Sequence, residues 1–145
     1  MKIGIDFGGV IVRASEGEDF NPELGENIAV PDCLESIAEL AREHEIYIIS
    51  KASRRVQSFT RQWLSKVNFY RVTSFAPSNL IFCEKRTEKA VICQSLGIDW
   101  FIDDNQEVID SLLGIVRKTS LFDGTISWRS LVSEIKANTA LQRTN

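Results

Sequence analysis

Short apolar runs alternate with helical patterns along most of this chain. The runs lie at residues 3–12, 46–49, 80–83, 100–102 and 115–117, with a weaker one at 120–123. Between them, apolar residues recur every three or four positions, which is the spacing of an amphipathic helix. Strands that alternate with helices form a mostly parallel sheet with right-handed crossovers and helices on both faces. We therefore expect an α/β fold with a doubly wound, five-stranded sheet in three layers.

Two details of the helices follow from the same spacing. The helix after residue 83 is expected to begin near Thr87, whose hydroxyl can cap it, and to end at Gly97. Its inward positions would be Val91, Ile92, Ser95 and Leu96. Trp63 and Trp128 fall at core-facing positions of other helices, and we interpret both as packing residues.

The chain has 145 residues, the length of one ordinary domain. We expect a single domain over residues 1–137 and a polar, frayed tail over residues 138–145. Residues 13–30 are polar and turn-rich, which predicts an exposed loop. That loop is too short to form a second domain.

Charge, cysteine content and hydropathy exclude several classes of partner and location for this chain. The net charge of −3 argues against a broad nucleic-acid interface, which usually needs basic residues. The three cysteines are scattered without a CxxC spacing, which is typical of buried, reduced thiols. No apolar run approaches the ~20 residues of a membrane span, and no signal-peptide core follows the N-terminus. We expect a cytoplasmic protein without a membrane partner.

Polar residues follow the predicted strands where such sheets bind ligands. Asp6 follows the first strand, Ser50 the second, and Asp103 with Asp104 the fourth, while Lys89 lies in the first turn of a helix. Taken singly, Ser50 or Asp104 could cap a helix and Lys89 could be solvated. Taken together they indicate a site, because neighbouring carboxylates repel each other unless a cation or proton compensates them.

Magnesium suits this set of residues. Mg²⁺ prefers oxygen ligands and is commonly held by one or two carboxylates together with a substrate phosphate. Asp6 could then attack phosphorus and form an aspartyl phosphate. Ser50, Lys89 and the neighbouring Lys51 would hold the phosphate oxygens, and the Gly8 and Gly9 backbone amides could approach the same group.

These motifs resemble those of the haloacid dehalogenase-like superfamily, whose members are mostly Mg²⁺-dependent phosphohydrolases. The matches are GIDFGGV around Asp6, IYIIS ending at Ser50, RTEKAV around Lys89 and FIDDN around Asp103 and Asp104, and they cover roughly residues 2–120. The resemblance implies a Rossmann-like sheet of order 5-4-1-2-3 with Asp6 at its centre. It also implies a metal site made by Asp6, the Gly8 carbonyl, Asp103 and Asp104. Lys85 is the alternative for the motif lysine.

The chain departs from the superfamily pattern at one position. Phosphatases of the superfamily carry a second Asp in the first motif, as general acid and base, where this sequence has Gly8. Glu18 or Asp19 on the following loop could replace it, although both are interpreted mainly as solvated charges. We expect a slow phosphohydrolase. The alternative is a catalytically impaired protein that binds a phosphoryl ligand or has a regulatory role.

The expected substrate is a phosphate ester, small or macromolecular, because neither gap between motifs holds a cap domain. A second copy of the chain could also close the open site. Arg54, Arg55 and Arg61 follow Ser50 and could guide an anion, but a solvated helix face is the main interpretation.

Two other classes fit less well. Receiver domains carry their acidic pair after the first strand, and dinucleotide-binding enzymes need a GxGxxG pattern that is missing here.

Overall fold

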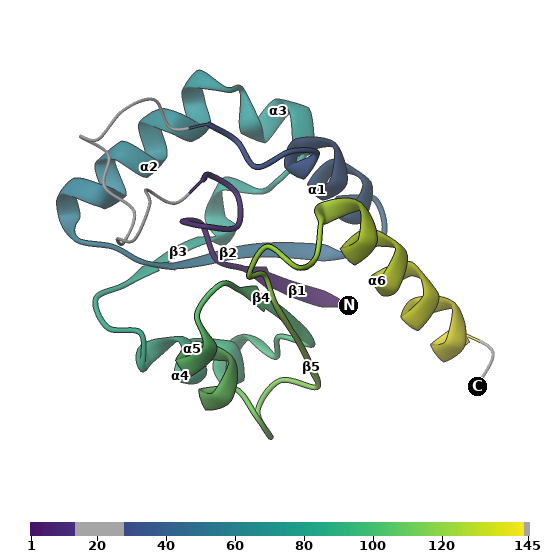
Figure 1. Ribbon diagram of the computed structural model, residues 1–145. Coiled ribbons are helices and arrows are strands. Elements are labelled where there is room, and N and C mark those ends of the chain that lie inside the picture. Colours follow the sequence, from purple (N-terminus) through teal and green to yellow (C-terminus); the bar gives the residue numbers. More distant parts are fainter. Residues whose placement is uncertain (14–27, 144–145) are drawn as a thin grey trace.

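The computed structural model describes residues 1–13 and 28–143 (Figure 1). A five-stranded sheet forms its centre, with the strands in the order β3-β2-β1-β4-β5 and every pair parallel. The strands are β1 (Lys2–Ile5), β2 (Glu45–Lys51), β3 (Leu80–Cys83), β4 (Trp100–Asp103) and β5 (Lys118–Leu121). The predicted fold class and strand order are thus confirmed, with β1 in the middle.

Helices cover both faces of the sheet. They are α1 (Cys33–Ala41), α2 (Arg54–Lys66), α3 (Phe69–Thr73), α4 (Glu88–Leu96), α5 (Gln106–Ser111) and α6 (Trp128–Arg143), with a 3₁₀ turn η1 (Pro77–Asn79) before β3. In Figure 1, α1, α2, α3 and α6 lie on one face, and α4 and α5 lie on the other. The side chains of the strands pack into two separate cores, one on each face of the sheet, because successive residues of a strand point to opposite faces.

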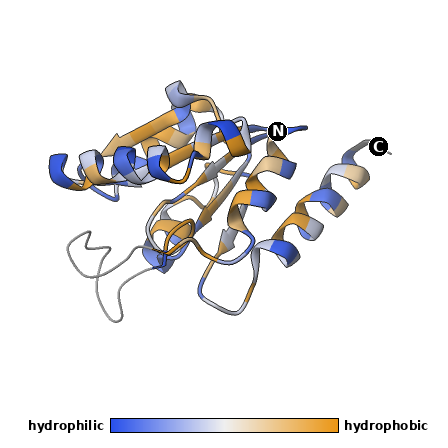
Figure 2. Cartoon of the chain, turned by 90° about the horizontal axis from the view of Figure 1, so that it is seen from above, coloured by the Kyte–Doolittle hydropathy of each residue, from blue (hydrophilic) through white to orange (hydrophobic). Residues whose placement is uncertain are grey.

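The larger core lies under α1, α2, α3 and α6. It holds Trp63 and Trp128, which are 6% and 0% exposed, so both tryptophans pack as predicted. The smaller core, under α4 and α5, includes Phe101 and Cys93. In Figure 2 the strands are mostly hydrophobic, while the helices carry both hydrophobic and hydrophilic residues. The three cysteines are free and buried, as the sequence indicated.

The first apolar run does not form one strand, contrary to prediction. β1 ends at Ile5, and the chain then folds back so that Ile11 N–H donates to the Phe7 carbonyl at 2.9 Å. Gly9 makes this reversal, because its φ of +81° lies in the left-handed region that favours glycine. Residues 10–12 are buried in this turn rather than in the sheet.

The fifth strand lies later than the main prediction. Residues 115–117 form a turn, because Ile115 and Val116 N–H both donate to the Leu112 carbonyl at 3.0 Å. β5 begins at Lys118 and overlaps the weaker expectation at residues 120–123.

The predicted inward face of α4 is correct for Ile92 and Leu96, which pack against the smaller core, and wrong for the other two residues. Val91 and Ser95 are exposed, and the buried residues are Lys89 and Cys93. Thr87 occupies the N-cap position, but its side chain makes no capping hydrogen bond.

α6 continues to Arg143, so residues 138–143 are helical and not a frayed tail. No Gly or Pro interrupts this segment. No helix in the described ranges is long and apolar enough to cross a membrane.

Candidate active site

The register of the central strands brings the predicted residues to one edge of the sheet. Ile5 of β1 pairs with Ile48 of β2 and with Ile102 of β4. Asp6, just after β1, and Asp103, the last residue of β4, therefore lie at the same level of neighbouring strands, and the Asp6 N–H donates to the Ile102 carbonyl at 2.9 Å. Both carboxylates are buried, with 8% and 0% of the residue exposed.

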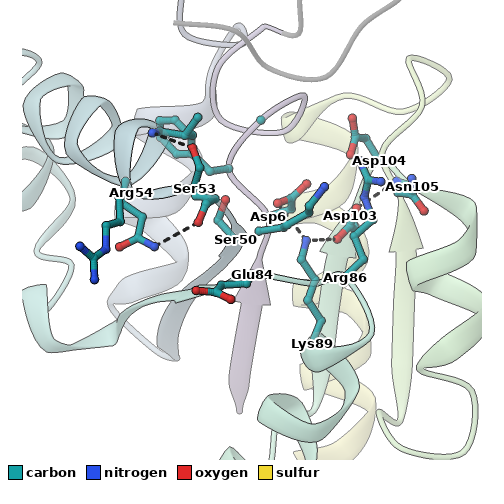
Figure 3. A pocket seen from close by; sticks show the side chains of 16 residues that line it. Asp6, Ser50, Ser53, Arg54, Glu84, Arg86, Lys89, Asp103, Asp104 and Asn105 are labelled. Atoms are coloured by element: carbon teal, nitrogen blue, oxygen red, sulfur yellow. Dashed lines mark hydrogen bonds and ion pairs between the residues drawn. The ribbon is translucent and has the colours of Figure 1, made fainter.

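Lys89 joins these two carboxylates. From the first turn of α4, its Nζ donates to Asp6 Oδ1 at 3.0 Å and to Asp103 Oδ2 at 2.8 Å, and the residue is 2% exposed (Figure 3). Lys85 is exposed, and its backbone N–H bonds Glu88. The structure thus brings Lys89, and not Lys85, to the acidic residues.

Asp104 completes the acidic cluster. One carboxylate oxygen from each of Asp6, Asp103 and Asp104 lies within 4.8 Å of the others. Asn105, the next residue, caps α5 by accepting from Val108 N–H at 3.1 Å, and its own N–H donates to Asp103 Oδ1 at 2.9 Å. The cap of α5 is therefore Asn105 rather than Asp104, which leaves the Asp104 carboxylate at the site.

The electrostatics of the cluster favour the binding of a cation. Burial raises the pKa of Asp6 well above its usual range; Lys89 opposes that rise, and Asp103 and Asp104 add to it. Burial and the Asp103 charge also raise the pKa of Asp104. Burial alone would lower the pKa of Lys89, but Asp6 and Asp103 hold it above its ordinary value. One ammonium thus faces three carboxylates, and the excess negative charge suits a divalent, oxygen-binding ion such as Mg²⁺.

A cavity of about 660 Å³ opens beside the cluster. Every residue predicted for the site except Gly9 borders this cavity. These lining residues are Asp6, Gly8, Ser50, Lys51, Lys89, Asp103 and Asp104. Ser50 is buried at the end of β2, whereas Lys51 is exposed.

Gly9 does not fit the predicted role as a phosphate donor. Its N–H donates to the Val12 carbonyl at 2.8 Å and closes the turn after β1. A Cβ at this position would lie 2.1 Å from Asp104 Oδ2, so Gly9 instead makes room for that carboxylate. The Gly8 N–H, by contrast, donates to no group within the described residues, and Gly8 borders the cavity.

Other lining residues were not predicted. Ser53, Gln57, Glu84, Arg86 and Asn105 also border the cavity. Most of them follow the ends of β2, β3 and β4, so the rule that ligands bind beyond strand ends could have found them. Of the three arginines considered, Arg54 borders the cavity, Arg61 lies over the Phe82 ring at 4.9 Å, and Arg55 is not among the lining residues. Glu18 and Asp19 lie outside the described residues.

Sequence comparison finds one informative relative. No family model matches the chain. A protein of Oceanobacillus iheyensis that is named as a candidate nucleotidase is 30% identical over 108 residues. The match covers 70% of this chain but only 55% of the length of that protein.

Solved structures resemble most of this chain. A HAD family enzyme from Bacteroides thetaiotaomicron, in complex with magnesium and inorganic phosphate, has a TM-score of 0.61 at 13% identity and covers 90% of this chain and 98% of its own. A chain of the Pnkp1/Rnl/Hen1 RNA repair complex also has a TM-score of 0.61, at 11% identity, and covers 83% of this chain and 42% of its own. At such low identities the likeness establishes the fold.

Proposed function

The chain has the fold of a HAD family enzyme, and from that premise we propose that it is a Mg²⁺-dependent phosphohydrolase of the haloacid dehalogenase-like superfamily. The observation that carries the proposal is the contact of Lys89 with both Asp6 and Asp103, beside Asp104, at the wall of an open cavity. The nucleotidase name of the relative and the magnesium and phosphate of the Bacteroides structure support it.

The residues divide the work as follows. An Asp6 carboxylate oxygen attacks phosphorus, the bond to the ester oxygen breaks, and the product is an aspartyl phosphate. Water then attacks that phosphorus, which releases inorganic phosphate and restores Asp6. Lys89 fixes the position of Asp6, and Ser50 and Lys51 are the proposed contacts for phosphate oxygens. Mg²⁺ held by Asp6, Asp103, Asp104 and the Gly8 carbonyl would neutralise phosphate charge.

Gly8 sets the expected rate. No side chain projects from position 8 to protonate the alcohol leaving group, which is the role of the superfamily's second Asp. General acid–base catalysis is typically worth about 10²–10⁴-fold, so esters with poor leaving groups should react slowly. The same glycine supports a second candidate, a protein that binds a phosphoryl ligand without turning it over.

A panel of phosphate esters distinguishes the two candidates. We expect Mg²⁺-dependent release of phosphate by the purified protein, and its loss in Asp6→Asn. Asp110→Asn is the matched control, because Asp110 is an exposed acid on α5 that does not line the cavity. Turnover no higher than that of Asp6→Asn on every ester would reject the enzyme and favour the binding protein.

A further inference from the structure

Side chains of opposite charge line different parts of the cavity along the sheet. Asp6 follows β1, and Asp103 and Asp104 lie at the end of β4. Lys51, by contrast, is the last residue of β2, and Arg54 begins α2. Figure 3 shows Ser53 and Arg54 at the start of α2, on the opposite side of the cavity from Asp104 and Asn105. The order β3-β2-β1-β4 therefore places an acidic end and a basic end within one cavity.

The cations at the two ends differ in their partners. Lys89 is buried and pairs with both Asp6 and Asp103. Lys51 and Arg54 are exposed, and neither makes an ion pair or a side-chain hydrogen bond with any residue that the structure describes. Among the described residues, no ion pair therefore neutralises the positive charge of the basic end.

One carboxylate opposes this charge. Glu84 follows β3 and lines the same cavity, and it is also exposed. The Ala52 N–H bonds the Cys83 carbonyl at 2.9 Å, which holds the segments after β2 and β3 side by side. Arg86 is a further lining cation, but it interacts with other groups, and the inference does not depend on it.

We infer that the substrate of this site carries a second anionic group, such as another phosphate, on the alcohol that leaves. This inference rests on the proposed function: the reacting phosphoryl group lies against Asp6, Ser50 and Lys51, and the second anion lies against Arg54, the other cation of the basic end. Neighbouring strands are about 4.8 Å apart, so the two anions should be separated by about 5–10 Å, or one to two strand spacings. A cavity of about 660 Å³ has room for both groups.

A matched pair of ligands tests the inference without turnover. Binding of a nucleoside 3′,5′-bisphosphate and of the 5′-monophosphate is measured by calorimetry on Asp6→Asn, which lacks the nucleophile. We expect the bisphosphate to bind at least about fivefold more tightly, the effect of one ion pair in partly exposed surroundings. Higher ionic strength should reduce this preference. In the wild-type protein, the same preference should appear in kcat/KM.

Variants at Arg54 and at the opposing Glu84 should change the preference for the bisphosphate in opposite directions. Arg54→Met should lower the ratio of the two affinities toward one, and Glu84→Gln should raise it. Arg55→Met is the matched control, because Arg55 is the next residue of α2 and does not line the cavity. Equal affinities for the two ligands, or a preference that Arg54→Met and Glu84→Gln leave unchanged, would overturn the inference. Failure of the proposed function would appear separately, as absence of turnover on all esters.

Discussion

Gly8 and Gly9 are neighbours with different structural demands. Gly9 has positive φ, and any side chain there would strike the Asp104 carboxylate. Gly8 is not among the positive-φ glycines of the described ranges, so its backbone suits an ordinary residue. Of the two neighbours, Gly9 is thus required for steric reasons, whereas the backbone at Gly8 does not itself require glycine.

A carboxyl group at position 8 should raise the rate of hydrolysis of one class of substrate. We expect Gly8→Asp to raise hydrolysis of esters with poor leaving groups by at least about tenfold, because a positioned acid supplies the proton that they need. Activated aryl phosphates should change little. Initial rates on both classes are the measurement.

Gly8→Asn is the control for that variant, because it has nearly the same shape but no acidic group. Circular dichroism should show that both variants fold. Equal rates for the Asp and Asn variants on poor leaving groups would contradict the idea of a missing acid.

At the scale of elements, α6 is tied to the turn after β1. Trp128 begins this helix, is fully buried, and donates from Nε1 to the Val10 carbonyl at 2.9 Å. Its ring also lies 5.7 Å from that of Phe122, which follows β5. The last helix thereby supports the turn from which Gly8 borders the cavity.

Loss of this hydrogen bond should destabilise the whole fold. We expect Trp128→Phe to lower the free energy of unfolding by about 1–3 kcal/mol, because the Val10 carbonyl is left buried without its donor. Chemical denaturation measures the change. Ser133→Ala, at an exposed position of the same helix, should stay within about 0.5 kcal/mol of wild type. A Trp128→Phe protein as stable as that control would show that the bond contributes nothing.

At the scale of the whole molecule, the acidic cluster joins segments that lie far apart in the sequence. Asp6 follows the first strand and Asp104 the fourth, so a cation bound by both stabilises the folded chain and not the unfolded one. Folding and metal binding are linked for this reason.

Magnesium should therefore raise the melting temperature. At a concentration one hundred times Kd, binding adds about 2.7 kcal/mol, and scanning calorimetry should show a shift of several degrees that a chelator reverses. Asp104→Asn should lose most of the shift; it is preferred to a change at Asp103, which also bonds Lys89 and Asn105. Asp110→Asn should keep the shift. No shift in the wild-type protein, even with beryllofluoride as a phosphate mimic, would reject the metal site.

The amino-acid sequence by itself determined the alternation of strands and helices, and with it a mostly parallel sheet, whereas the order of the strands was expected from the resemblance to the superfamily. Apolar periodicity is a local property, and crossover handedness restricts how such units assemble. Because parallel strands end at one edge of the sheet, the sequence also indicated that Asp6, Ser50, Asp103 and Asp104 would gather there. That part of the candidate site needed only strand ends and topology.

Only the tertiary structure decided the features that depend on contacts between distant residues. The buried face of α4 combines Lys89, which pairs with two carboxylates, with Ile92, Cys93 and Leu96, and this rotation leaves Val91 exposed, although its spacing had placed it inward. In the turn after β1, the Gly9 N–H donates to the Val12 carbonyl and is not available to a phosphate. The run of apolar residues in the sequence did not predict this turn. The wall that carries Arg54 and Glu84 forms because β2 and β3 lie side by side, and such pairing is set by the packing of the whole sheet.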